Sequence, residues 1–130
     1  MPVSYDYDPK LNAVIVHLKG TVTKEEVLDY LDRLLADNSI QKGNFEIVDL
    51  SVADSYAVTE EDLAEIALKG EEVSAAKGMR RSYYYAESTH AYSIAKTLQD
   101  LAEDLCVEVE VYRDWEHMVR VMGMRTKEGL

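Results

Sequence analysis

The stretch FEIVDLSVADSYAVTEEDL, residues 45–63, decides how the rest of the chain is interpreted. It opens with a short apolar run that is typical of a buried strand. It closes on Thr-Glu-Glu-Asp, residues 59–62, which is typical of a capped helix start. The stretch therefore predicts a strand, a polar connection and a helix. It also raises the question of what the two serines in the connection, Ser51 and Ser55, do.

The rest of the chain continues this alternation of strands and helices. Two strand-like runs, residues 3–8 and 12–20, flank an Asp8-Pro9 turn signal and predict a hairpin. The further predicted elements are a helix capped by Thr23, the strand 45–50, a helix capped by Thr59 and ended by Gly78, a strand over residues 82–86, a helix capped by Ser88 or Thr89, a strand over residues 107–113 and a short helix from Asp114 to Met122, ended by Gly123.

This order predicts an α/β fold in which a β-hairpin is followed by α-β-α-β-α-β-α. Strands that alternate with helices form a largely parallel sheet with right-handed crossovers. Residues 107–113, VEVEVYR, alternate strictly between apolar and polar side chains, which suits an outer strand. We expect a single domain over residues 1–123 and a frayed tail over residues 124–130.

Composition excludes several classes of protein. The net charge is −11, so the chain would repel a phosphate backbone, and we expect no nucleic acid partner. Cys106 is the only cysteine, which excludes an internal disulfide and fits a reducing compartment. The first ten residues lack the pattern of a signal peptide, and no apolar stretch is long enough to span a membrane. We therefore expect a cytoplasmic protein.

Four segments, in this order, resemble the SpoIIAA-like group of the STAS-type fold, which also resembles the lipid-binding CRAL-TRIO domains. They are YDPKLNAVIVHLKGTVTKEEV (7–27), FEIVDLS (45–51), HAYSIAKTLQDLAEDL (90–105) and VEVEVYRDWEHMVRVMG (107–123). The resemblance implies a small, non-enzymatic protein that binds regulatory kinases or sigma-control partners. It also implies a phosphorylation switch at a serine that starts the second helix.

Ser51 and Ser55 match that switch only in part. The family pattern ends in Asp-Ser-Ser-Gly at a helix start, whereas Tyr56 and Ala57 follow Ser55 here. The helix cap comes later, at Thr59, and the acidic first turn would repel an added phosphate. We therefore expect both serines to form turns and caps. A phospho-regulated antagonist of an anti-sigma factor is the alternative.

Catalytic and metal sites have little support in the sequence. None of Ser51, Ser55 and Ser88 has the flanking glycines of a nucleophile elbow, although His90 could meet Ser51 at one sheet edge. A serine hydrolase is thus a more distant alternative. The three histidines show no metal-binding spacing, and no phosphate-binding glycine loop is present, so we expect no metal and no cofactor.

We expect a binding module whose site is the carboxyl edge of the sheet, since loops at that edge usually carry ligand contacts. The ligand would be a partner protein or a small, partly apolar molecule, and the basic cluster of Lys77, Arg80 and Arg81 is the second choice of site. We also expect a twofold homodimer, from the alternating strand and the nine tyrosines. The predicted site residues are Ser51, Ser55, Tyr56, Tyr85, Ser88, His90 and Trp115.

Overall fold

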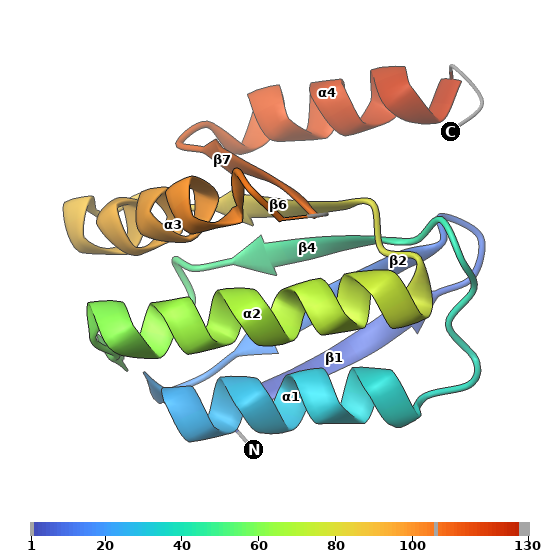
Figure 1. The fold of residues 1–130 in the computed structure, drawn as a ribbon. Coiled ribbons are helices and arrows are strands. Elements are labelled where there is room, and N and C mark those ends of the chain that lie inside the picture. Colours follow the sequence, from blue (N-terminus) through green and yellow to red (C-terminus); the bar gives the residue numbers. More distant parts are fainter. Residues whose placement is uncertain (1, 106, 128–130) are drawn as a thin grey trace.

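A computed structural model of the chain describes residues 2–105 and 107–127. Figure 1 shows the order of its elements along the chain. The strands are β1 (Val3–Asp8), β2 (Ala13–Leu18), β3 (Thr21–Thr23), β4 (Phe45–Asp49), β5 (Ser55–Ala57), β6 (Arg81–Tyr85) and β7 (Glu108–Tyr112). The helices are α1 (Lys24–Ala36), α2 (Glu60–Lys77), α3 (Thr89–Ala102) and α4 (Trp115–Lys127).

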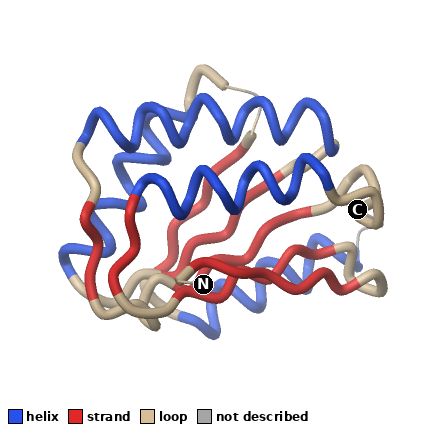
Figure 2. Tube along the Cα trace, turned by 90° about the horizontal axis from the view of Figure 1, so that it is seen from below, coloured by secondary structure: helices blue, strands red, loops and turns tan. Residues whose placement is uncertain are grey.

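Five strands form a mixed sheet in the order β1-β2-β4-β6-β7. The hairpin strands β1 and β2 pair antiparallel, and β2, β4, β6 and β7 pair in parallel. This arrangement confirms the predicted α/β fold, including the outer position of the alternating strand β7. Helices α1, α2 and α3 cover one face of the sheet, and α4 lies on the opposite face over β6 and β7 (Figure 2).

Local hydrogen bonds start helices α1, α2 and α3, and end α2, where the sequence predicts. Thr23 and Thr59 each accept a hydrogen bond from the backbone three residues on, and the acid at that position bonds back to the cap. Ser88 caps α3, and Gly78 ends α2 in the left-handed conformation, with φ of 66°. A side chain at this position would be strained, which explains why glycine is placed there.

The core lies between the sheet and helices α1, α2 and α3. Successive residues of a strand point to opposite faces, so alternate residues of β2 point toward these helices. Val14, Val16 and Leu18 are buried in this way, while His17 between them is exposed and pairs with Asp6 at 2.8 Å. On the opposite face, α4 buries Met118 completely.

Two features differ from the sequence prediction. Residues 55–57, expected in a plain loop, form β5, which pairs in parallel with β3 in a separate two-stranded sheet. The prediction that Gly123 ends the last helix is wrong, because α4 continues to Lys127 through residues that we expected in a tail. Arg125 holds this part of the helix against the sheet, since its guanidinium donates to the Tyr83 hydroxyl at 2.9 Å.

The part of the chain that the structure describes contains no helix with the length and hydropathy needed to cross a membrane. Cys106 and the tail residues 128–130 lie outside the described residues.

Candidate functional site

The carboxyl ends of the parallel strands bring the predicted site residues to one edge of the sheet, but in two separate groups. Tyr56 lies beside His90, with ring centroids 6.2 Å apart. Tyr85 lies beside Trp115, with ring centroids 5.3 Å apart and an edge-to-face geometry. The first group lies toward α3, and the second lies on the α4 face.

Tyr56 closes the connection after β4 onto the core. Its hydroxyl donates a hydrogen bond to the backbone carbonyl of Leu50, and its ring lines an interior cavity with Val58 and Leu63. Burial, followed by the charge of Asp49, raises the pKa of Tyr56 above its usual range, so the hydroxyl stays neutral. Tyr56 therefore stabilises the loop from inside and offers little free surface for contact.

Ser51 forms a turn and Ser88 caps α3, as predicted, whereas Ser55 lies in strand β5. The Ser51 hydroxyl and amide donate to the Asp49 carboxylate at 2.5 and 2.9 Å, which forms a local turn. The Ser55 hydroxyl lies 2.8 Å from that of Thr21, and Ser88 Oγ accepts from the backbone of its helix. His90 packs against Tyr56, and no hydrogen bond joins it to any of these serines within the described residues.

Trp115 is exposed at the predicted site, with 43% of its surface accessible. The Tyr85 ring supports it, and the Tyr85 hydroxyl donates to Glu87 at 2.7 Å. This hydrogen bond is the largest cause that raises the pKa of Tyr85 to about 12. Arg113 donates to the Glu87 carbonyl at 2.8 Å, and Asp114 caps α4. Trp115 is therefore held in a fixed position at the surface.

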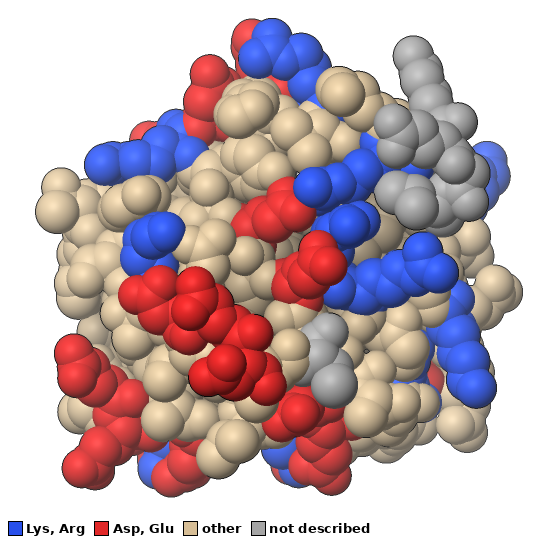
Figure 3. Space-filling view, turned by 45° about the horizontal axis from the view of Figure 1, so that its top comes forward, with Lys and Arg blue, Asp and Glu red and all other residues tan. Residues whose placement is uncertain are grey.

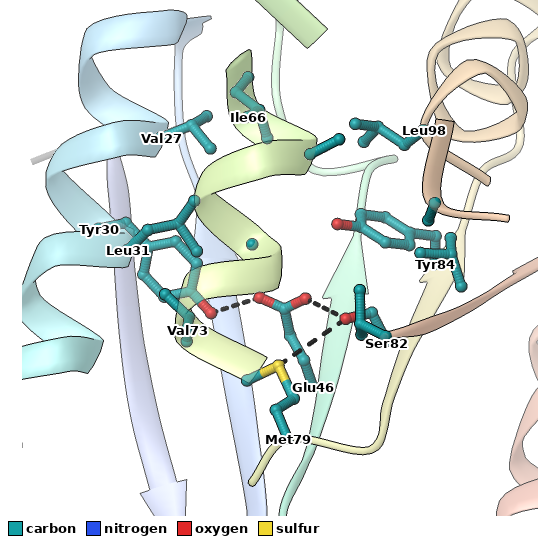
Figure 4. A pocket seen from close by; sticks show the side chains of 15 residues that line it. Val27, Tyr30, Leu31, Glu46, Ile66, Val73, Met79, Ser82, Tyr84 and Leu98 are labelled. Atoms are coloured by element: carbon teal, nitrogen blue, oxygen red, sulfur yellow. Dashed lines mark hydrogen bonds between the residues drawn. The ribbon is translucent and has the colours of Figure 1, made fainter. Parts of the chain in front are cut away.

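Sequence reasoning missed a buried carboxyl group, Glu46, which lies between the sheet and the helices (Figure 4). Only 5% of its surface is accessible. The Tyr30 and Ser82 hydroxyls donate to it at 2.5 and 2.7 Å. Desolvation raises the pKa of Glu46, and the two hydrogen bonds lower it by less. The signal was present in the sequence, because Glu46 shares the inward register of Val48, two residues on in the same strand.

Two small cavities flank Glu46, and each has a volume of about 70 Å³. The Tyr84 hydroxyl points into the cavity that Figure 4 shows. Burial, with the charge of Glu46 as the second cause, raises the pKa of Tyr84 well above its usual range. Ligand pockets usually measure about 300–1,000 Å³, so these cavities are too small for most organic molecules.

Among the described residues, no group of three or more histidine, cysteine, aspartate or glutamate side chains is arranged to hold a metal ion. No protein-family model matches the chain, and no curated protein matches it.

The fold has a counterpart among solved structures. A crystal structure of a DUF3478-family protein with a SpoIIAA-like fold, from Shewanella loihica, superposes with a TM-score of 0.56 at 12% sequence identity. The match covers 92% of this chain and 91% of the other. It supports the SpoIIAA-like part of the resemblance and does not extend to CRAL-TRIO domains. The chain therefore has a SpoIIAA-like α/β fold.

Proposed function

We propose that the chain is a non-enzymatic binding module that binds a partner protein at the carboxyl edge of its sheet. The observation that carries this proposal is the exposed but supported side chain of Trp115. Tryptophan and tyrosine contribute the largest binding energies in protein interfaces. An aromatic side chain that is already ordered also loses less entropy on binding.

The proposed contact surface, which we call the Trp115 surface, consists of Trp115, Tyr85 and Val119. Val119 lies one helical turn after Trp115 on the same side of α4, and 44% of its surface is exposed. The surface thus combines two aromatic rings with an aliphatic side chain. Apolar side chains with polar atoms at their margin are typical of the centre of a protein interface.

The sizes of the cavities favour a protein over a small, partly apolar molecule as the partner at this edge. The apolar space lies inside the core, in the two cavities of about 70 Å³ beside Glu46. A protein partner needs no internal space, because it covers exposed side chains.

The alternative of a phospho-regulated antagonist rests on one observation, the exposure of Ser51 and Ser55. Ser55 lies in β5, four residues before the cap of α2, so the helix amides do not point at it. The acids of the first turn of α2 lie close in sequence and disfavour an added phosphate. A phosphate adduct on Ser55, detected by mass spectrometry in protein purified from its native cells, would favour this alternative.

The proposed function is tested with Trp115→Ala and the matched control Leu68→Ala. Leu68 lies on α2, and 62% of its surface is exposed. Native and variant chains are immobilised, and proteins captured from cells of the source organism are quantified by mass spectrometry. We expect a partner that the native and Leu68→Ala chains retain and that Trp115→Ala loses.

The captured partner is then purified and its affinity measured by calorimetry. Loss of a central interface tryptophan costs about 2 kcal/mol or more of binding free energy, which raises the dissociation constant roughly 30-fold. Circular dichroism confirms that both variants remain folded. A partner that binds Trp115→Ala and the native chain equally would refute the Trp115 surface as the site.

A further inference from the structure

A pocket distinct from the two cavities beside Glu46 lies at the edge of the sheet where the parallel strands begin, opposite the carboxyl edge. Its volume is about 340 Å³. We call it the basic pocket, because five lysine and arginine side chains belong to residues that line it. Figure 3 shows lysine and arginine side chains gathered toward one end of the molecule. The cationic residues of the pocket are Lys10, Lys42, Arg80, Arg81 and Arg125.

Segments far apart in the sequence meet here because of the strand register. Ala13 of β2 pairs with Phe45 of β4, which pairs with Arg81 of β6, so the starts of these strands lie side by side. Lys10 lies in the turn before β2, and Lys42 lies just before β4. Helix α4 runs back across this face and brings Arg125 to the same end.

The basic pocket gathers positive charge, whereas the chain as a whole is negatively charged. The whole protein has a net charge of −11, with fourteen lysines and arginines, and five of these line this one pocket. Like charges repel at short range, so a bound anion would stabilise this cluster by offsetting the charges that no carboxylate pairs.

Two of the five cations are already held in place. Arg81 pairs with Glu108 at 2.9 Å and Glu110 at 3.7 Å, and Arg125 pairs with Glu110 at 2.7 Å. The other three, Lys10, Lys42 and Arg80, are exposed and form no ion pair within the described residues. Three cations are therefore left to bind a ligand beside two ordered guanidinium groups.

Apolar side chains line the same pocket. The Phe45 and Tyr83 rings meet in an edge-to-face geometry, with centroids 5.6 Å apart. Met122 is a further apolar residue of the lining. Arg125 lies over the Tyr83 ring at 5.6 Å. A ligand of matching chemistry has an anionic group and an apolar group. Its size is limited by the 340 Å³ volume, which lies at the lower end of the range for small-molecule sites.

We propose that the basic pocket binds a small phosphate-bearing molecule that also carries an aromatic or aliphatic group. A phosphate monoester has a charge between about −1.5 and −2 near neutral pH and three acceptor oxygens, which suits several cations at once. A carboxylate has a single charge and leaves more of this cluster uncompensated. The basic pocket lies at the other end of α4 from the Trp115 surface, so the two sites are tested independently.

The probes are phenyl phosphate and inorganic phosphate at constant ionic strength, titrated into ¹⁵N-labelled protein and followed by NMR. We expect saturable shifts of the Gly43 and Arg81 amide resonances, with phenyl phosphate at least threefold tighter than inorganic phosphate because of its ring. Arg80→Gln and Lys42→Gln should each weaken phenyl phosphate at least fivefold. Both side chains are exposed, so the variants should fold normally.

The matched control is Lys19→Gln, which removes the same charge from an exposed position outside the pocket. It should change the phenyl phosphate affinity less than twofold. Equal weakening by Lys19→Gln and Arg80→Gln would overturn the proposal, because it would show diffuse electrostatic attraction. Vesicles containing phosphatidic acid form the other arm. Binding to the vesicles without saturable binding of phenyl phosphate would overturn the small-molecule pocket in favour of a lipid surface.

Discussion

Tyr30→Phe removes a single oxygen atom from the interior and tests the buried Glu46. The Tyr30 side chain is 3% exposed, and its hydroxyl donates to Glu46 at 2.5 Å. The phenylalanine ring keeps the edge-to-face contact with Tyr5, whose centroid is 5.7 Å away. The substitution therefore leaves the packing in place and removes one of the two hydroxyls that bind the Glu46 carboxyl group, the other being that of Ser82.

The free energy lost should depend on pH in a defined direction. Desolvation raises the pKa of Glu46 above its ordinary value near 4.5, and the Tyr30 hydrogen bond opposes that increase. Because the folded pKa is raised, the stability that this group contributes is fully present below the unfolded pKa. It is lost as the pH rises through the folded pKa. Removing the Tyr30 hydroxyl raises the folded pKa further, so the variant should lose more stability at neutral pH than in acid.

The expected magnitude follows from the charge of the acceptor. Near pH 4.5 or below, a neutral hydrogen bond is lost, which costs about 0.5–1.5 kcal/mol. At a pH high enough to ionise Glu46, a hydrogen bond to a carboxylate is lost, which costs about 1.5–3 kcal/mol. Urea denaturation followed by circular dichroism at pH 4.5, 6.0 and 7.5 measures the difference.

Two controls make the measurement specific. Tyr92→Phe removes a hydroxyl that has no hydrogen bond within the described residues, and it should cost less than about 0.5 kcal/mol at every pH. In a Glu46→Gln background, the pH dependence of the Tyr30→Phe effect should disappear. A loss for Tyr30→Phe that is no larger than the loss for Tyr92→Phe at every pH would refute the hydrogen bond between Tyr30 and Glu46.

Three further predictions concern local structure and assembly. Thr23→Ala and Thr59→Ala should each lower the free energy of unfolding by about 1 kcal/mol in urea, because each removes a helix cap; no loss at either site would contradict the capping boxes. Gly78→Ala should cost at least about 1–2 kcal/mol, since its φ is 66° and a Cβ would lie 3.0 Å from that of Lys42; thermal unfolding checks this. Light scattering at micromolar concentrations should show a twofold dimer, formed through the edge strand β7, and a monomer mass would exclude it.

The sequence alone was sufficient for features that depend on neighbours along the chain. The capping boxes at Thr23 and Thr59 were predictable because each involves residues three positions apart. The hairpin and the outer strand β7 were predictable from turn residues and from strict alternation. The end of α4 was not, because Arg125 is held by Tyr83 and Glu110, which are distant in sequence and outweigh the low helix propensity of Gly123.

The tertiary structure decided which side chains meet at the candidate sites. The sequence predicted both Tyr85 and Tyr56 as site residues at the carboxyl edge of the sheet. Strand direction and loop closure nevertheless place them in separate groups. The basic pocket depends on the register that joins Phe45 to Arg81 and on the path of α4, and neither is encoded in a local pattern. Long-range contacts of this kind depend on how elements pack around a common core, whereas caps, turns and alternation depend on adjacent residues. The sequence by itself therefore determined most elements of this protein, whereas packing determined the pairing of β3 with β5, the end of α4, and the surfaces and pockets.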